Sequence, residues 1–312
     1  MNGRALPLAA LLLAGAAAAQ ETPPAKRALL IGINDYATDQ FTDLRGAVND
    51  VETVRQVLTQ RFGFPEANVT VLTDAAATRA AILAAVRKLV AEAGPKDTVY
   101  LHFSGHGSQV QDMDGDEADG RDETIVPEDG RTEGIADITD DELGGILAGL
   151  TADRCVLVLD SCHSGTMTRG ALRLRTVPAD TRLDLYDNSK IRTRSVVRQD
   201  RPERCILLTG AAANESALDG PVEGGRSHGM FSYALAKALS GPGGAAPLTA
   251  VHDQVQATFR CLVRQGNIDP KAQETLNMRI HACWINPALP PAATTAAQAP
   301  TGQPGTEKPE AR

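Results

Sequence analysis

The chain has 312 residues, of which 42% are hydrophobic and 22% are charged, and its formal net charge at pH 7 is −8. This composition is typical of a globular protein with an ample core and excludes a chain that is disordered throughout. The acidic balance argues against a nucleic acid as the main partner, because proteins that bind phosphate backbones carry basic faces.

Both ends of the chain differ in composition from its middle. Residues 1–19 hold one positive charge, a short apolar stretch and a run of small residues, which together predict a secretory signal peptide. The apolar stretch is too short for a bilayer, so we expect a periplasmic or secreted mature protein without a membrane span. Residues 286–312 are rich in Pro, Ala, Thr and Gln and predict a disordered tail.

Between these ends, apolar runs typical of buried strands alternate with helical patterns. The predicted strands cover 27–34, 68–74, 98–103, 155–159, 205–209 and 277–283. The predicted helices cover 50–61, 77–94, 139–148, 231–239 and 248–265. This alternation predicts an α/β fold in which helices cover both faces of a mostly parallel sheet. Ligands of such sheets bind beyond the carboxyl ends of the strands.

Two of the apolar runs end in clusters of small and polar residues, in "YLHFSGHG" and "VLVLDSCHSG". They place His106 and Cys162 just beyond the ends of two predicted strands. A nearby imidazole activates a thiol as a nucleophile and later protonates the leaving amine. The backbone N–H groups of Gly107 and Cys162 are suited to hold an oxyanion. We therefore predict one catalytic site that contains His106 and Cys162.

Two other histidines lie near the two strand ends in the sequence. His163 is adjacent to Cys162, and on an extended chain its side chain would point to the opposite side. His102 lies within a predicted strand and is expected to be a hydrogen-bonded core residue. His106 is therefore the predicted base.

The chain has five cysteines, an odd number that leaves at least one thiol over even under oxidising conditions. Cys155 and Cys205 begin apolar runs and are expected to be buried thiols that behave as small hydrophobic residues. Cys261 and Cys283 are candidates for a disulfide, which the sequence alone does not establish.

Six stretches carry a resemblance to a known family: "ALLIGINDY", "LRGAVNDV", "SGHG", "DGRDETIVPED", "DSCHSG" and "LTGAAANESALD". Together they resemble the caspase-type cysteine peptidases, and specifically the type I metacaspases. The resemblance implies a caspase-like three-layer sandwich, and together with the predicted signal peptide we expect a secreted bacterial peptidase. The implied peptidase domain covers 26–285, with a large-subunit-like part at 26–168, an Arg-rich junction at 169–204 and a small-subunit-like part at 205–285.

The resemblance also implies a cysteine endopeptidase that acts on peptide or protein substrates and cleaves after Arg or Lys. We expect it to be a monomer. Asp50, Ser104 and Asp160 match the family's primary specificity pocket. Two carboxylates can bind a guanidinium through charge-assisted hydrogen bonds, which accounts physically for that preference. Without the resemblance, Asp50 would equally be the N-cap of the helix that follows it, and Asp160 a solvated strand-end carboxylate.

Acidic residues crowd the stretch "DMDGDEADGRDE". It does not form an EF-hand loop, because Glu117 occupies the position that requires glycine. The resemblance implies instead an activating Ca²⁺ held by Asp122, Asp140 and Asp141, whose carboxylate oxygens suit that hard cation. Arg169 stands where the family often has a fourth aspartate and would oppose a cation. The bond cleavage itself requires no cofactor. Whether Ca²⁺ activates the enzyme stays open.

Nine arginines and one lysine lie between Arg169 and Arg204. An enzyme that cleaves after Arg would find its own substrate there, for example at Arg192, Arg194 or Arg198, so self-processing is a hypothesis. A solvated loop is the alternative. For the whole protein, a legumain-like or gingipain-like peptidase of different specificity and a non-catalytic caspase-like binding module also stay open.

Overall fold

The computed structural model describes residues 23–113, 115, 117, 119–162, 172–186, 205–210, 217–241, 247–265, 267 and 279–283. The predicted signal peptide and tail lie outside these residues, as do His163, Arg169, Arg192, Arg194 and Arg198. Among the described helices, none combines the length and the apolar character that crossing a membrane requires.

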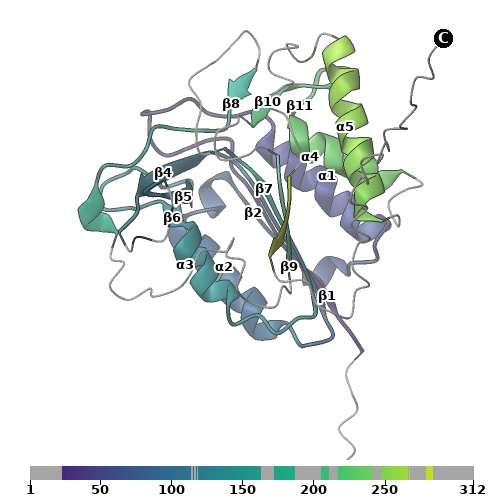
Figure 1. The fold of residues 1–312 in the computed structure, drawn as a ribbon, viewed down its shortest axis with the longest axis horizontal. Helices are drawn as coiled ribbons and strands as arrows, with labels where there is room; N and C mark the ends of the chain where they lie inside the picture. Colours follow the sequence, from purple (N-terminus) through teal and green to yellow (C-terminus); the bar gives the residue numbers. More distant parts are fainter. Residues whose placement is uncertain are drawn as a thin grey trace, which may run out of the picture.

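A six-stranded sheet forms the centre of the molecule, in the order β12-β9-β7-β3-β1-β2 (Figure 1). Its strands are β1 (Lys26–Gly32), β2 (Val69–Thr73), β3 (Thr98–Ser104), β7 (Arg154–Asp160), β9 (Cys205–Thr209) and β12 (Arg279–Cys283). All neighbouring strands are parallel except β12, which runs antiparallel to β9. Ser104 pairs with Gly32 on one side and with Asp160 on the other, so three strands end at the same level.

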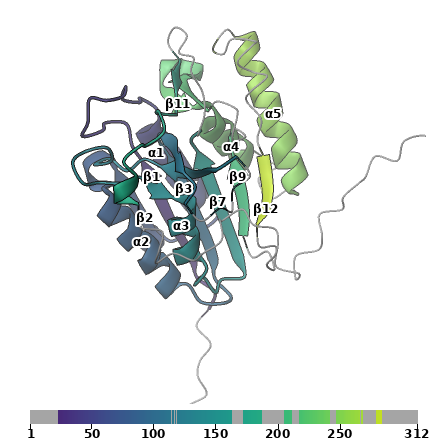
Figure 2. The same ribbon diagram turned by 60° about the vertical axis from the view of Figure 1, so that its left-hand side comes forward.

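Helices cover both faces of this sheet (Figures 1 and 2). They are α1 (Ala47–Gln60), α2 (Arg79–Glu92), α3 (Asp140–Leu147), α4 (Met230–Ser240) and α5 (Leu248–Arg264). On β1, Leu29 and Ile31 join the core formed with α2 and α3, whereas Ala28 and Leu30 join the core formed with α1, α4 and α5. Strands buried on both faces are apolar throughout, which is why their sequences show no alternation. The predicted three-layer α/β architecture is confirmed.

Two small antiparallel sheets were not predicted. One has the order β4-β5-β6, from β4 (Gly107–Gln111), β5 (Arg121–Ile125) and β6 (Ile138–Thr139), and β5 begins within the acidic stretch. The other has the order β11-β10-β8, from β8 (Arg173–Leu174), β10 (Leu218–Pro221) and β11 (Ser227–Gly229). Their strands are short and mostly polar or glycine-containing, so they lack the apolar runs from which strands are predicted.

The first helix begins earlier than predicted. Its N-cap is Gly46 and its first residue Ala47, which places Asp50 inside the first turn. The alternative role of Asp50 as the N-cap is therefore wrong. Its side chain is buried and faces the carboxyl end of β3, where Ser104 donates a hydrogen bond to it.

Candidate active site

His106 follows the end of β3, and backbone and side-chain contacts fix its ring. Its Nε2 lies 2.8 Å from the carbonyl oxygen of Thr42. A carbonyl only accepts, so Nε2 carries the proton and Nδ1 of the neutral ring is left as the acceptor. Nδ1 is buried, and among the described residues it has no hydrogen-bond partner. The ring thus presents a basic nitrogen to the interior of the site.

Aromatic residues that sequence reasoning did not single out surround this imidazole. The His106 ring centroid lies 5.0 Å from that of Tyr36 and 5.3 Å from that of Phe41. The backbone N–H of His106 also donates to the Tyr36 hydroxyl, at 2.7 Å. This burial lowers the pKa of His106 to about 4, so the imidazole is neutral at physiological pH. Tyr36 is the last residue of the stretch "ALLIGINDY", so the family resemblance was the sequence signal that could have identified it.

Cys162 follows the end of β7, the strand next to β3. Its thiol is buried and lies 3.9 Å from the carbonyl oxygen of Ala217. Burial raises the pKa of this thiol to about 12, so it is protonated at physiological pH. The thiol and the imidazole are therefore both uncharged in a site that is shielded from water.

A segment of the chain itself, which begins at β8 and includes Arg175 and Val177, covers the site. The carbonyl oxygen of Arg175 accepts hydrogen bonds from the N–H groups of Gly107, at 2.9 Å, and Cys162, at 3.1 Å. These are the two groups predicted to hold an oxyanion. On either side, the Arg175 N–H donates to Ala217 O and the Val177 N–H donates to Gly107 O. The segment is thus bound in extended form, as a peptide that adds a strand to β10.

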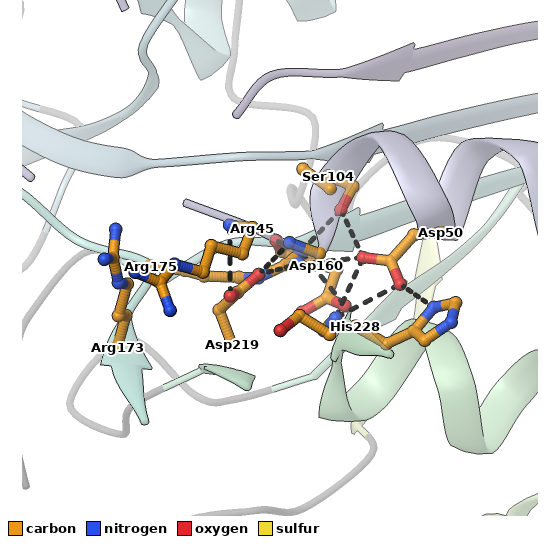
Figure 3. A network of polar contacts seen from close by, with 12 residues as sticks. Arg45, Asp50, Ser104, Asp160, Arg173, Arg175, Asp219 and His228 are labelled. Carbon is orange, nitrogen blue, oxygen red and sulfur yellow. Dashed lines mark hydrogen bonds and ion pairs between the residues drawn. The ribbon is translucent and has the colours of Figure 1, made fainter. Parts of the chain in front are cut away.

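The side chain of Arg175 fills a pocket whose walls include all three predicted pocket residues (Figure 3). Its Nη2 lies 2.7 Å from Asp50 Oδ2 and 3.0 Å from Asp219 Oδ2. Its Nη1 donates to Ser104 Oγ and to Asp160 O, and lies 3.3 Å from Asp160 Oδ2. The guanidinium and the three carboxylates are inaccessible to solvent. The structure therefore brings Asp50, Ser104 and Asp160 together around an arginine.

The electrostatics of this pocket favour a bound cation. Burial alone would raise the pKa of Asp50, but the Arg175 guanidinium and His228 lower it below its ordinary value. Burial raises the pKa of Asp160 despite the same guanidinium. For Arg175, burial acts to lower the pKa, and the carboxylates of Asp160, Asp50 and Asp219 outweigh it and raise the pKa. Buried carboxylates at this density are tolerated only when they are paired with a positive group.

Residues around β11 complete the pocket, and sequence reasoning missed them. The Gly229 N–H donates to both carboxylate oxygens of Asp50, and His228 Nδ1 lies 2.9 Å from Asp50 Oδ1. A Cβ atom at position 229 would lie 2.2 Å from Asp160 Oδ2 and 2.5 Å from Arg175 Cζ, so only glycine leaves room for the guanidinium. In the sequence, these residues are marked only by the dipeptide His-Gly, which lies shortly before the helix predicted at 231–239.

The predicted calcium ligands lie on the small β4-β5-β6 sheet and on α3. Asp122 is on β5, and Asp140 and Asp141 form the first turn of α3. Within the described part of the chain, the oxygens that converge to within 4.8 Å of one another belong to Glu117, Glu123 and Asp140. The convergent group thus shares only Asp140 with the predicted set. Burial, with neighbouring carboxylates, raises the pKa of Glu123 to about 7.

The remaining histidine and cysteine predictions concern the core. His102 is fully buried, with Nε2 at 3.0 Å from Ser232 Oγ, which confirms it as a hydrogen-bonded core residue. Cys155 is buried in the central sheet, as predicted. Cys261 is partly exposed on α5. Cys261 is a free thiol, so the candidate disulfide between Cys261 and Cys283 is not formed. The side chain of Cys205 lies outside the described ones, so its predicted burial is not tested.

Comparison with known proteins gives consistent similarities. Residues 26–169 match the family model described as "Metacaspase, peptidase C14 domain". Metacaspase-1 of Ajellomyces capsulatus is 34% identical over 256 residues, which cover 69% of this chain and 70% of that protein. Metacaspase-1 of Eremothecium gossypii is 33% identical over 262 residues, which cover 69% of this chain and 57% of that protein.

Among solved structures, protein GSU0716 from Geobacter sulfurreducens is similar with a TM-score of 0.61 and 25% identity, covering 84% of this chain and 94% of that one. The chain also matches Metacaspase-1B of Aspergillus fumigatus, which is 32% identical over 256 residues. The match covers 62% of that protein, so the chain spans less than two thirds of the length of this relative and of the one from Eremothecium gossypii. The matches nevertheless extend over both the strand end that bears His106 and the strand end that bears Cys162. On this evidence the chain belongs to the metacaspase family, peptidase C14.

Proposed function

We propose that the protein is a cysteine endopeptidase that cleaves peptide bonds after arginine or lysine. One observation carries the proposal: an arginine side chain fills the acidic pocket while its carbonyl oxygen meets two N–H groups, one of them that of Cys162. A substrate bound in this way has its carbonyl polarised directly beside the thiol. We also propose that the protein is periplasmic or secreted and monomeric, and these two proposals rest on the sequence alone.

The proposed reaction is acyl transfer. The Cys162 sulfur attacks the carbonyl carbon as its proton passes to His106 Nδ1, and the N–H groups of Gly107 and Cys162 stabilise the oxyanion. The C–N bond then breaks, and His106 protonates the leaving amine. Water hydrolyses the thioester and restores the thiol. The fixed Nε2–H contact of His106 with Thr42 O keeps Nδ1 available for both transfers.

Reporter peptides that differ only at the residue before the cleaved bond test this function. We expect cleavage after Arg and Lys and none after Asp or Asn, because only a cation compensates the buried carboxylates. Preferred cleavage after Asn or Asp would favour a legumain-like or other relative. Absence of any cleavage, with no labelling of Cys162 by an Arg-directed electrophile in folded protein, would favour a non-catalytic binding module.

The same assay tests calcium activation. The oxygens of Glu117, Glu123 and Asp140 fit a hard divalent cation, and we propose that they would hold Ca²⁺. A cation there would neutralise a crowded acidic region between β5 and α3, and it has no part in the bond cleavage itself. We expect chelation to lower the rate of reporter cleavage and added Ca²⁺ to restore it. Equal rates in both conditions would remove calcium from the proposal.

We also propose that the enzyme processes itself at the Arg175–Thr176 bond. The support is the position of Arg175, whose side chain and carbonyl occupy the substrate positions of the site. Arg192, Arg194 and Arg198, which the sequence suggested as cleavage sites, lie outside the described residues. Among the described arginines, Arg175 has the geometry of a bound substrate residue.

Replacing Arg175 by glutamine is expected to abolish cleavage at this bond, because an amide cannot supply the positive charge that three buried carboxylates require. The measurement is mass spectrometry of the fragments formed on incubation. Arg173→Gln is the matched control: it makes the same charge change two residues away, where the Arg173 side chain donates a hydrogen bond to the Asp43 carbonyl oxygen. The control should still be cut after Arg175. Cutting between 175 and 176 in Arg175→Gln would contradict the assignment.

A further inference from the structure

The pocket contacts the two ends of the guanidinium separately. Each terminal nitrogen of Arg175 has two acceptors in the protein, which matches its two N–H groups. For Nη2 these are Asp50 Oδ2, at 2.7 Å, and Asp219 Oδ2, at 3.0 Å. For Nη1 they are Ser104 Oγ and Asp160 O. The Nε atom has no partner among the described residues, so recognition is concentrated on the terminal nitrogens.

Asp219 is built into this pocket by contacts that do not depend on the arginine. It lies on β10, paired with Arg173 of β8 and with Gly229 of β11. Its Oδ2 accepts from the Gly46 N–H at 2.8 Å and its Oδ1 from the Arg45 N–H at 3.2 Å. The side chain is 1% exposed. The carboxylate is therefore fixed in advance by the loop that precedes α1, with Oδ2 directed at the guanidinium (Figure 3).

A lysine would use this arrangement poorly. Its side chain ends one atom earlier than that of arginine, with the ammonium near the position of the guanidinium carbon. A single nitrogen there cannot contact Asp219 on one side and Ser104 with Asp160 on the other, as the planar guanidinium does. If Asp219 were neutral, one N–H of a bound arginine would lose a charged acceptor in a buried site, whereas a lysine has no N–H at that place.

We propose that Asp219 is a specificity-determining residue that makes the pocket select arginine over lysine. It lies outside the predicted pocket set of Asp50, Ser104 and Asp160 and outside the residues 26–169 that match the family model. The inference rests on the proposed function and adds to it a substrate class: peptides with arginine, or another group with two terminal N–H-bearing nitrogens, before the cleaved bond.

The test compares kcat/KM for a pair of reporter peptides that differ only in Arg or Lys at that position, in wild type, Asp219→Asn and Asp219→Ser. The ratio of the two values does not depend on how much enzyme is covered by the Arg175 segment, because coverage scales both equally. We expect the value for Arg to fall about 30-fold and that for Lys about threefold, so that the ratio falls about tenfold.

Asn34→Ala is the matched control for a merely structural effect. Asn34 Oδ1 accepts from the Ala47 N–H at 2.9 Å, so this variant loosens the same start of α1 without changing the charge of the pocket. It should lower both kcat/KM values by the same factor and leave the ratio as in wild type. A ratio that falls equally in Asn34→Ala and Asp219→Asn would assign Asp219 a structural role and overturn the inference.

An unchanged ratio in folded Asp219→Asn and Asp219→Ser would also overturn it, while the proposed function would stand. Wild type that does not cleave the Arg reporter would instead overturn the proposed function. Folding is checked by thermal unfolding. If neither variant folds, the test is inhibition of the wild-type enzyme by analogues of the two side chains. We expect n-butylguanidine to inhibit at least about tenfold more strongly than n-pentylamine. Equal inhibition would overturn the selection of guanidinium.

Discussion

Alanine at position 162 is expected to abolish both the cleavage of arginine reporter peptides and any fragmentation of the chain itself. The thiol is the proposed nucleophile, and the loss of a nucleophile from such a site costs at least about 10⁴-fold in kcat. The backbone N–H of residue 162 would still bind the substrate carbonyl, so binding of the Arg175 segment should persist. Initial rates and gel analysis over time measure the two losses.

Cys155→Ala is the matched control for this variant. Cys155 lies on the same strand, β7, and is 3% exposed, so its loss changes core packing without touching the strand end. This variant should cleave the reporter at nearly the wild-type rate and unfold at a slightly lower temperature. Residual cleavage above about 1% in mass-verified Cys162→Ala would place the nucleophile elsewhere in the chain.

The part of this site that follows from the sheet could be predicted from the sequence. Apolar runs predict parallel strands, and the level ends of β1, β3 and β7 bring the residues that follow them to one edge. For that reason the residues after β3 and β7 lie close enough for the Gly107 and Cys162 N–H groups to donate to the same Arg175 carbonyl oxygen. Asp50 could be associated with them only through the family resemblance, because the sequence pattern placed the start of α1 too late.

The remaining pocket residues depend on contacts between distant segments. Asp219 accepts a hydrogen bond from the N–H of the N-cap residue Gly46, 173 positions earlier. Arg175 contacts Asp50 across 125 positions and is one of nine arginines in its region. No local pattern distinguishes it from the others, since its contacts are with residues of α1, β3, β7 and β10. Such choices are fixed by tertiary packing.

This packing also explains why the Cys162 thiol and the His106 imidazole are uncharged while the Arg175 segment covers them. Covering the thiol and the imidazole removes water from both, and desolvation favours the uncharged form of each. The same coverage strengthens the attraction between guanidinium and carboxylates, because screening by water is lost. The ion pairs of the Arg175 side chain therefore add to the backbone hydrogen bonds that hold the segment.

Asp50→Asn is expected to lower kcat/KM for the arginine reporter by about 10² to 10³-fold. Asp50 accepts from the guanidinium, from Ser104 Oγ and from the Gly229 N–H, and it pairs with His228. An amide supplies one acceptor atom and turns an N–H₂ group toward donors at the other. Removing one partner of a buried ion pair costs about 3–5 kcal/mol, since the opposite charge is left uncompensated. Steady-state kinetics with the Arg reporter measures the loss.

Glu52→Gln separates this effect from a general loss of negative charge on α1. Glu52 lies two positions further along the helix and is exposed, where its contact with Arg226 at 3.3 Å is a surface ion pair. Surface pairs contribute about 0–1 kcal/mol, so this variant should retain nearly full activity. If Asp50→Asn cleaved the Arg reporter as fast as Glu52→Gln, the acidic pocket would not be the binding site for the basic side chain. The Arg175 contacts seen in the uncut chain would then be a feature of folding rather than of substrate recognition.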